Sequence, residues 1–457
     1  MLRVPALIVG GGISGLVCAY ALRKAGVDAH VWEVSARAGG VIRSERRDGY
    51  LLEFGPQSFS SSAAVKTLCN ELAIESELVE APRQASRYVL VQGALQAVPL
   101  SPPALLASSL LSAGTKARLA RDMFGRSEPP EQDESVTGFV RRKFSEELLD
   151  RLVGPFVSGI FAGDPEKLSL RSAFPPMYEA EKSTGSVIRG IMKQMKARKG
   201  SGQRPTLLSF RSGNETLVRA LAGTLGPALR LESEAKRVDA KGEGQGRIFE
   251  VRARRSGQDE TICAEHLILA TPTDVTGRLI RDIDGALESL LAAIEYAPVA
   301  IVSLGYRQSD VGHSLEGFGF LVPRSAGLHV LGTVWNSSLF PARAPNGNVL
   351  LTSFIGGATN PQLVAQNAEK LADLVHGEIR PLLAIRHAPT FVHVEKYERA
   401  LPQYNLGHAA KLETIERLRQ GVPNLWLIGN YLRGPSIGSC VEQAQAVAAA
   451  VLARVRG

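Results

Sequence analysis

The sequence is poor in cysteine and has no long apolar run. Its four cysteines, Cys18, Cys69, Cys263 and Cys440, form no CxxC pair, so we expect neither a disulfide framework nor a thiolate metal site. The eight histidines show no HxxxH spacing, and we predict no bound metal. The lack of about eighteen consecutive apolar residues argues against a membrane-spanning helix. The first expected strand begins almost at Met1, so we expect no signal or transit peptide, a bacterial source and a cytoplasmic location.

Acidic residues are outnumbered by basic ones. The chain has 53 Lys and Arg against 45 Asp and Glu, which gives a net charge of +8. Such an excess suits a nucleic acid, an anionic membrane surface or an acidic substrate, and equally a chain with no charged partner. The basic clusters lack interleaved aromatic residues, so we expect no nucleic-acid partner. With 457 residues, the chain is long enough for about three domain-sized units.

Charge is also missing from one long segment, since no charged residue occurs over 88–115. Prolines break any long helix there, and basic residues follow over 116–143. An apolar segment beside basic helices can bind anionic lipid without spanning the bilayer. We therefore expect peripheral contact with an inner membrane; the alternative is that 88–115 is buried and the protein freely cytosolic. A basic stretch over 193–205 contains glycine and is expected to be an exposed loop.

The most informative pattern that is present lies in the first forty residues. A strand-like run over 4–9 enters a glycine turn, a helical run over 16–22 follows, and a short strand over 29–32 ends on Glu33. In a dinucleotide-binding unit, such glycines make the tight turn and admit a pyrophosphate at the helix N-terminus, while the acid accepts hydrogen bonds from a ribose. The predicted cofactor-binding residues of this unit are Gly10, Gly11, Gly12, Ile13, Ser14, Gly15 and Glu33.

The acid narrows the choice of dinucleotide. A carboxylate at Glu33 would repel the 2′-phosphate of NADP, which leaves FAD or NAD. The residues that follow, with Arg37 and then the pair Gly39–Gly40, resemble the extended signature of flavoproteins in the amine oxidase superfamily. We therefore predict one molecule of FAD, bound without a covalent link.

Later segments are needed to complete the nucleotide-binding sheet. Buried strand-like runs at 266–271 and 425–430 suit this role. We predict an α/β plus α+β fold, in which a discontinuous Rossmann-type FAD-binding domain carries an inserted β-rich substrate domain and a mostly helical domain. The expected boundaries are 1–60, 205–285 and 405–457 for the FAD-binding domain, 61–90 and 286–404 for the substrate-binding domain, and 91–204 for the helical, membrane-associating domain.

Several further motifs resemble those of the protoporphyrinogen IX oxidase family, the FAD enzymes of haem and chlorophyll biosynthesis. The resemblance runs nearly end to end. It is carried by GYLLEFGPQSF at 49–59, SGIFAGDPEKLS at 158–169, GFGFLVP at 317–323, SFIGGATN at 353–360 and PQYNLGH at 402–408.

The resemblance implies further contacts with FAD. Gly40 and Val41 are expected against the cofactor, and the backbone of Val238 against its adenine. Glycine in the 55–58 segment would admit a flat flavin ring. Pro435 departs from the small aliphatic run usual in the family and removes a backbone donor. The additional predicted cofactor-binding residues are Gly40, Val41, Gly55, Pro56, Gln57, Ser58, Val238, Pro435, Ser436 and Ile437.

The resemblance also implies a substrate site for a porphyrinogen. A guanidinium at Arg87 would pair with a propionate, because its fork binds both carboxylate oxygens. Leu321, Val334 and Phe354 are expected to sandwich the pyrrole rings, and a side chain at Gly159 would obstruct the substrate. No catalytic side chain is expected, since the flavin N5 accepts the hydride.

The implied reaction is the six-electron oxidation of protoporphyrinogen IX by dioxygen, which gives protoporphyrin IX and hydrogen peroxide. The enzyme is expected to be a monomer or a homodimer. Oxidation of coproporphyrinogen III is the first alternative, and its four propionates would favour a more cationic pocket than Arg87 alone provides. An amine oxidase is the second; it would need an aromatic cage, for which Trp426 and Tyr431 form no clear pair.

Overall fold

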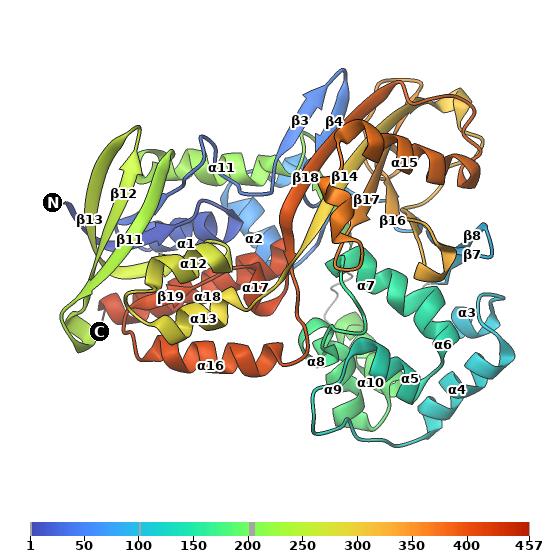
Figure 1. The fold of residues 1–457 in the computed structure, drawn as a ribbon, viewed down its shortest axis with the longest axis horizontal. Coiled ribbons are helices and arrows are strands. Elements are labelled where there is room, and N and C mark those ends of the chain that lie inside the picture. Colours follow the sequence, from blue (N-terminus) through green and yellow to red (C-terminus); the bar gives the residue numbers. More distant parts are fainter. Residues whose placement is uncertain (1, 100–101, 201–205, 457) are drawn as a thin grey trace.

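The computed structural model describes residues 2–99, 102–200 and 206–456. These residues form three parts, which Figure 1 shows as a mixed sheet with helices on the left, a second sheet at the upper right and a helical lobe at the lower right. We call the first part the Rossmann lobe. The chain enters it three times, as expected for a discontinuous domain.

The sheet of the Rossmann lobe has the order β10-β2-β1-β13-β12-β11, and β19 also pairs with β13. Its strands are β1 (Leu2–Val9), β2 (Ala29–Trp32), β10 (Leu229–Arg230), β11 (Ser233–Lys241), β12 (Ile248–Arg255), β13 (Gln258–Leu269) and β19 (Leu425–Leu427). Strands β2, β1, β13 and β19 are parallel neighbours. The prediction that segments near 266 and 425 complete the sheet is therefore confirmed.

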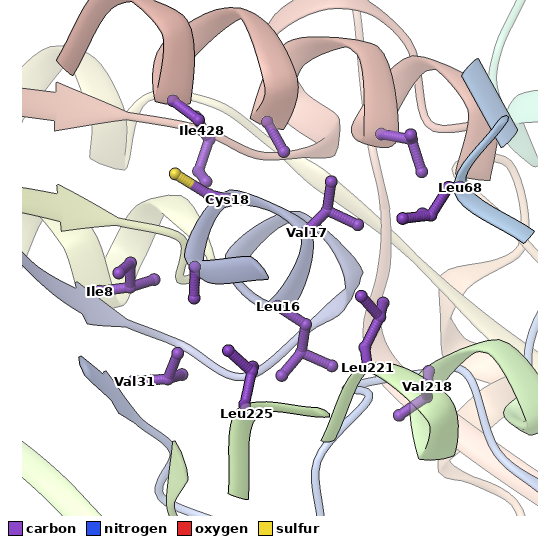
Figure 2. Packing of buried hydrophobic residues seen from close by; sticks show 14 of the residues in the cluster. Ile8, Leu16, Val17, Cys18, Val31, Leu68, Val218, Leu221, Leu225 and Ile428 are labelled. Carbon is purple, nitrogen blue, oxygen red and sulfur yellow. The ribbon is translucent and has the colours of Figure 1, made fainter. Parts of the chain in front are cut away.

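Four helices bury apolar side chains on one face of this sheet. They are α1 (Ile13–Lys24), α2 (Ala63–Glu71), α11 (Glu215–Leu225) and α18 (Ile437–Arg456). Figure 2 shows Leu16 and Val17 of α1 among Leu68, Leu221 and Ile428, and all five are fully buried. Burial of each such side chain stabilises the folded state by about 1.5–3 kcal/mol relative to leaving it exposed.

Residues 61–80 differ from their expected assignment to the substrate domain. Helix α2 lies in the core of the Rossmann lobe. Strands β5 (Phe59–Ser60) and β6 (Leu78–Glu80) both pair with β9 (Leu207–Phe210), which leads directly into α11. The amphipathic α2 has its apolar face buried by α18, so this segment packs with the nucleotide-binding elements.

The second sheet has the order β18-β14-β17-β16-β15-β7-β8. Its strands are β7 (Arg87–Val91), β8 (Ala94–Val98), β14 (Tyr296–Arg307), β15 (Gly319–Leu321), β16 (Val330–Trp335), β17 (Asn348–Gly356) and β18 (Phe391–Pro402), and α15 (Ala368–Leu382) packs on it. Residues 94–98 were expected in the helical unit. They instead form an antiparallel hairpin with β7, because Gln92 and Gly93 adopt the left-handed backbone of a tight turn.

The helical lobe comprises α3 (Pro102–Ala107), α4 (Ala113–Phe124), α5 (Val136–Lys143), α6 (Glu146–Leu148), a π-helical turn (Leu149–Val153), α7 (Gly154–Phe161), α8 (Leu170–Ala173), α9 (Pro175–Thr184) and α10 (Val187–Gly200). The expected loop over 193–205 is wrong for 193–200, since α10 continues to Gly200; lysine and arginine are good helix formers. Residues 201–205 lie outside the described residues. No helix among the described residues is long and apolar enough to cross a bilayer.

The basic residues at the end of α5 are engaged inside the helical lobe. Arg142 contacts Glu134 at 2.6 Å and Glu181 at 2.9 Å. Lys143 contacts the buried Asp122 at 2.6 Å. These cations were expected to face lipid, but their charge is already neutralised by carboxylates of the lobe, of which Glu181 and Asp122 are buried.

Helices α12 (Thr273–Ile280), α13 (Gly285–Ala292), α16 (His408–Gln420) and α17 (Asn430–Arg433) bury apolar side chains on the opposite face of the Rossmann sheet. Further elements are β3 (Ser44–Arg47), β4 (Tyr50–Glu53) and α14 (Asn336–Leu339). The β3–β4 hairpin lies between the Rossmann lobe and the second sheet in Figure 1, and β18 runs from the second sheet back towards α16.

Candidate active site

The glycine turn between β1 and α1 is shaped by close backbone packing. Gly10 has φ +108°, and a Cβ there would lie 2.7 Å from the carbonyl oxygen of Ala270. A Cβ on Gly15 would overlap the carbonyl oxygen of Gly10. At Gly12, by contrast, an added Cβ would have no atom within 4 Å. The turn is therefore tight on its inner side and open at Gly12, where a ligand could approach the protein backbone.

The N-terminus of α1 is suited to an anion. Its N-cap is Gly12, which offers no side chain to the first-turn amides, and no acidic residue lies in that turn. The positive end of the helix dipole and its free N–H groups therefore face the open side of the turn. A pyrophosphate fits this position.

Glu33 lies at the end of β2 and is 7% exposed. Its Oε2 accepts a hydrogen bond from the Gly11 N–H at 2.6 Å, and its Oε1 accepts one from the Ser35 N–H at 2.9 Å. The carboxylate thus holds the glycine turn in place. Each oxygen keeps a further lone pair, so it can still accept from a ribose hydroxyl.

The segment over 37–42 lies against the glycine turn. The Gly39 N–H donates to the Gly11 carbonyl at 2.7 Å, and Gly40, at φ +58°, lies close to the Cα of Gly12. Arg37 donates to the carbonyls of residues 38 and 42 and so fixes the segment. Val41 is 46% exposed despite its apolar side chain. The structure therefore brings Gly40 and Val41 beside Gly10–Gly15.

In the turn over 55–58, the structure gives Gly55 a different reason from the expected one. A Cβ on Gly55 would overlap the carbonyl of Val41, so glycine here serves a close backbone contact. The amide of Gln57 is buried; it donates to the carbonyls of Glu53 and Gly55 and accepts from Asn336 Nδ2 at 2.7 Å. The Gln57 side chain therefore shapes the turn from inside, and the backbone of 55–58 is what remains for a ligand.

A buried ion pair beneath this turn was missed by the sequence analysis. Arg343 Nη1 lies 2.9 Å from Glu53 Oε1, and both side chains are almost completely buried. Ser44 Oγ donates to Glu53 Oε2 at 2.6 Å, and the Asn214 N–H donates to Oε1 at 3.0 Å. Burial nonetheless raises the pKa of Glu53 to about 7. The pairing joins residues from distant segments, so no local pattern signals it.

Val238 is not brought to this site. Its side chain lies in the core on the far side of the sheet, and its backbone pairs with Val251. The residue of β11 that meets Glu33 is Ser233, whose N–H donates to the Glu33 carbonyl at 2.8 Å. Val238 lies five residues further along the strand than Ser233, a distance of roughly 16 Å. Which residue of β11 lies beside Glu33 depends on the strand register, which a motif match does not provide.

The loop before α18 is held by two stacked rings. Tyr404 and His408 lie with centroids 4.4 Å apart and planes 9° apart. The Gly434 N–H donates to Tyr404 Oη at 2.7 Å, and the Tyr404 hydroxyl donates to the Asn430 carbonyl. The loop continues into Pro435 and Ser436, and Ile437 starts α18 with Ser436 Oγ accepting from the Ser439 N–H.

The predicted substrate residues share one face of the second sheet. Gly319 lies between Arg87 of β7 and Val334 of β16. Two residues further on, Gly332 lies between Leu321 of β15 and Phe354 of β17. Because side chains alternate along a strand with a period of two, all four side chains project from the same face.

Helix α7 covers this face at one point. A Cβ on Gly159 would lie 2.7 Å from Leu321 Cδ2. Phe156 and Ile160, one turn apart on α7, are 44% and 39% exposed. Helix α7 therefore adds exposed apolar side chains close to the sheet, which suits a large apolar ligand with few charges.

Arg87 is the cation of this face. Its guanidinium lies 5.4 Å from the centroid of the Phe318 ring. Among the described residues it has no acidic partner within ion-pair distance. An exposed, unpaired guanidinium beside an aromatic ring is free to bind a carboxylate.

Comparisons with known proteins agree with this geometry. The sequence matches the flavin-containing amine oxidoreductases over residues 13–452. It is 35% identical to the chloroplastic protoporphyrinogen oxidase of Nicotiana tabacum, over 97% of this chain and 85% of that protein. It is 28% identical to the coproporphyrinogen III oxidase of Bacillus subtilis, over 96% of each chain. The chain belongs to the flavin-containing amine oxidoreductase family.

Within this family the chain is an FAD-dependent oxidoreductase of the protoporphyrinogen oxidase group, because its 35% identity to that group extends over nearly its whole length. A crystal structure from Exiguobacterium sp. 255-15, assigned to the same group, shares the fold with a TM-score of 0.81 at 24% identity, over 100% of this chain and 99% of that one. Cyclohexylamine oxidase from Brevibacterium oxydans IH-35A gives 0.73 at 18%, over 99% and 100%. The α/β plus α+β prediction is confirmed.

The residues present fit the family cofactor. The open side of Gly12, the uncapped N-terminus of α1 and the buried Glu33 suit the pyrophosphate and ribose of FAD. Residues 40–41, 55–58 and 435–437 would hold the flavin end. Neither Trp426 nor Tyr431 offers a cage for an amine, since both are buried in the core of the Rossmann lobe.

Proposed function

We propose that the chain oxidises protoporphyrinogen IX to protoporphyrin IX in haem biosynthesis, with dioxygen reduced to hydrogen peroxide. The observation that carries the proposal is the shared face of the second sheet, where Leu321, Val334 and Phe354 lie on the same side as one unpaired guanidinium at Arg87. A flexible apolar macrocycle with carboxylates at one end suits such a face. Relatives at 35% identity are protoporphyrinogen oxidases by name.

The side chains act in this reaction by binding and orienting. Arg87 would anchor a propionate, Leu321 and Phe354 would contact the pyrrole rings, and Gly159 would leave room for the macrocycle. FAD, when bound, supplies the hydride acceptor and the reaction with dioxygen. No side chain is assigned as a general base, and protons would leave to solvent.

Coproporphyrinogen III is the competing substrate, because it has four propionates and relatives at 28% and 25% identity act on it by name. One unpaired arginine on the sheet face favours the substrate with two propionates. Aerobic incubation with each porphyrinogen, followed by porphyrin fluorescence, tests the choice. A kcat/KM at least tenfold higher for coproporphyrinogen III would overturn the proposal.

We also propose that the helical lobe makes peripheral contact with an anionic membrane from the cytoplasmic side. Phe124 at the end of α4 is 82% exposed, and Met192 and Met195 on the neighbouring α10 are 48% and 41% exposed. Apolar side chains, and not the paired Arg142 and Lys143, would carry the contact.

Flotation with anionic and neutral liposomes tests this contact. Replacing Phe124 by serine should reduce the fraction that floats, whereas Val392→Ser, an exposed apolar residue of β18, should not. Equal flotation of the wild type and Phe124→Ser would contradict it.

A further inference from the structure

The segment over 336–343 follows β16 and reaches across to the turn over 53–57. Asn336 Nδ2 donates to Gln57 Oε1 at 2.7 Å, and Arg343 Nη1 donates to Glu53 Oε1 at 2.9 Å. None of these four side chains is more than 7% exposed. The two bonds are therefore shielded from water, where removal of one partner leaves the other unsatisfied.

The receiving side of these bonds is rigid. Gln57 Nε2 donates to the carbonyls of Glu53 and Gly55, each at 3.0 Å. The Pro56 carbonyl accepts from Asn214 Nδ2 at 2.7 Å. The Gln57 side chain and three carbonyls of the turn are thus tied to neighbours, so a displacement of 336–343 would be transmitted to the turn.

The donating side is joined to the proposed substrate face. Asn336 directly follows Trp335, the last residue of β16, and lies two residues after Val334. Phe340 and Leu339 pack in one apolar cluster with Val334. The segment therefore connects strand β16 with the turn that the family places against the flavin.

We propose that Asn336 and Arg343 are positioning residues, which hold strand β16 and the 53–57 turn at one separation so that porphyrinogen and flavin meet in the reacting geometry. The inference rests on the proposed function and adds two residues to it. A displacement of about 1 Å between reacting groups can slow a reaction by about a hundredfold, while each binding site on its own stays intact.

The variant Asn336→Leu tests the role of the amide, because it keeps the volume and removes the donor. The matched control is Ser337→Ala, in the same segment, whose hydroxyl accepts from the Leu350 N–H. We expect flavin reduction by protoporphyrinogen, measured anaerobically in a single turnover, to slow by about 10–100-fold in Asn336→Leu. The KM and the Kd for FAD should change by less than about threefold, and the control should match the wild type.

A double variant separates positioning from stability at the ion pair. Arg343→Met leaves the buried Glu53 without its partner and should lower the melting temperature. Glu53→Gln combined with Arg343→Met should recover that temperature, because two neutral groups replace a broken pair. The slow flavin reduction should persist in the double variant, since the fixed link between the segments is still missing.

Two results would overturn the inference: flavin reduction within twofold of the wild type in Asn336→Leu and in the double variant, or a slowing matched by an equal loss of FAD. Visible circular dichroism of the bound flavin, which should differ from the wild type in Asn336→Leu, reads the placement without any substrate. If the wild type itself oxidises neither porphyrinogen, the proposed function fails, and this spectrum still decides the positioning role.

Discussion

The Rossmann lobe and the second sheet prepare for their ligands in different ways. In the lobe, the contacts are backbone groups; Gly10 and Gly15 let chain segments pack closely, while Gly12 leaves the turn open. On the sheet, the contacts are side chains, and the register of four strands puts them on one face. The first arrangement depends on about thirty consecutive residues. The second needs segments from β7 to β17 to align.

The contrast is tested most strongly inside the glycine turn. Gly15→Ala places a Cβ against the Gly10 carbonyl and should destabilise the apoprotein by about 3 kcal/mol with loss of FAD. Gly12→Ala meets no protein atom, so the apoprotein should stay within about 1 kcal/mol of the wild type. Its FAD affinity should nonetheless fall at least tenfold. Urea unfolding of the apoproteins measures the stability, and flavin titration measures the FAD affinity. Equal losses of stability in the two variants would contradict the assignment of Gly12 to the cofactor.

The segment over 402–408, which leads from β18 of the second sheet into α16, should be sensitive to acid. Burial lowers the pKa of His408 to about 4, whereas an unfolded histidine titrates near 6.5. Between pH 6.5 and pH 4, His408 is protonated in the unfolded chain but stays neutral in the folded chain. The free energy of unfolding is therefore highest above pH 6.5 and falls as the pH drops towards 4. The loss should reach about 3 kcal/mol. Urea unfolding at pH 7.5 and pH 5 should show a smaller difference for His408→Gln than for the wild type.

On the second sheet, Arg87→Ala should raise the KM for protoporphyrinogen and leave kcat nearly unchanged, because a propionate contact exists in both the ground and the transition state. The binding free energy of the substrate should fall by about 1.5–3 kcal/mol, the value of a charge-assisted hydrogen bond. Arg83→Ala, at an exposed arginine before β7, is the control. An unchanged KM in Arg87→Ala would remove this residue from the substrate site.

The smallest effect is expected at Gly159. An added Cβ would lie 2.7 Å from Leu321 Cδ2, the mobile end of a side chain. Gly159→Ala should therefore raise the KM by about threefold, since Leu321 can shift towards the substrate space. Leu321→Ala in the same chain should restore part of the affinity; a further rise in KM would show that the two residues act independently.

The sequence supports the two regions to different degrees. The tight turn from Gly10 to Gly15 and the position of Glu33 at the end of β2 could be predicted, because the motif is local and Gly10 and Gly15 have a steric reason. The link between Glu53 and Arg343 could not, since it joins two segments through tertiary packing alone. Val238 was misplaced because a motif match carries no register along β11. The loop expected over 193–205 failed at 193–200, where charge was taken as a sign of exposure although lysine and arginine also favour helix.

The order of the strands has a consequence for synthesis. Leu7 pairs with Leu267, and Leu267 pairs with Leu425, so neighbours in the sheet are made far apart in time. The first glycine turn leaves the ribosome long before β13, β19 and α18, which complete the sheet and its core. Chains with such distant pairings fold slowly and expose apolar surface while they wait. FAD loading is thus expected to follow release of the full chain, and a nascent chain stalled before residue 425 should bind no flavin.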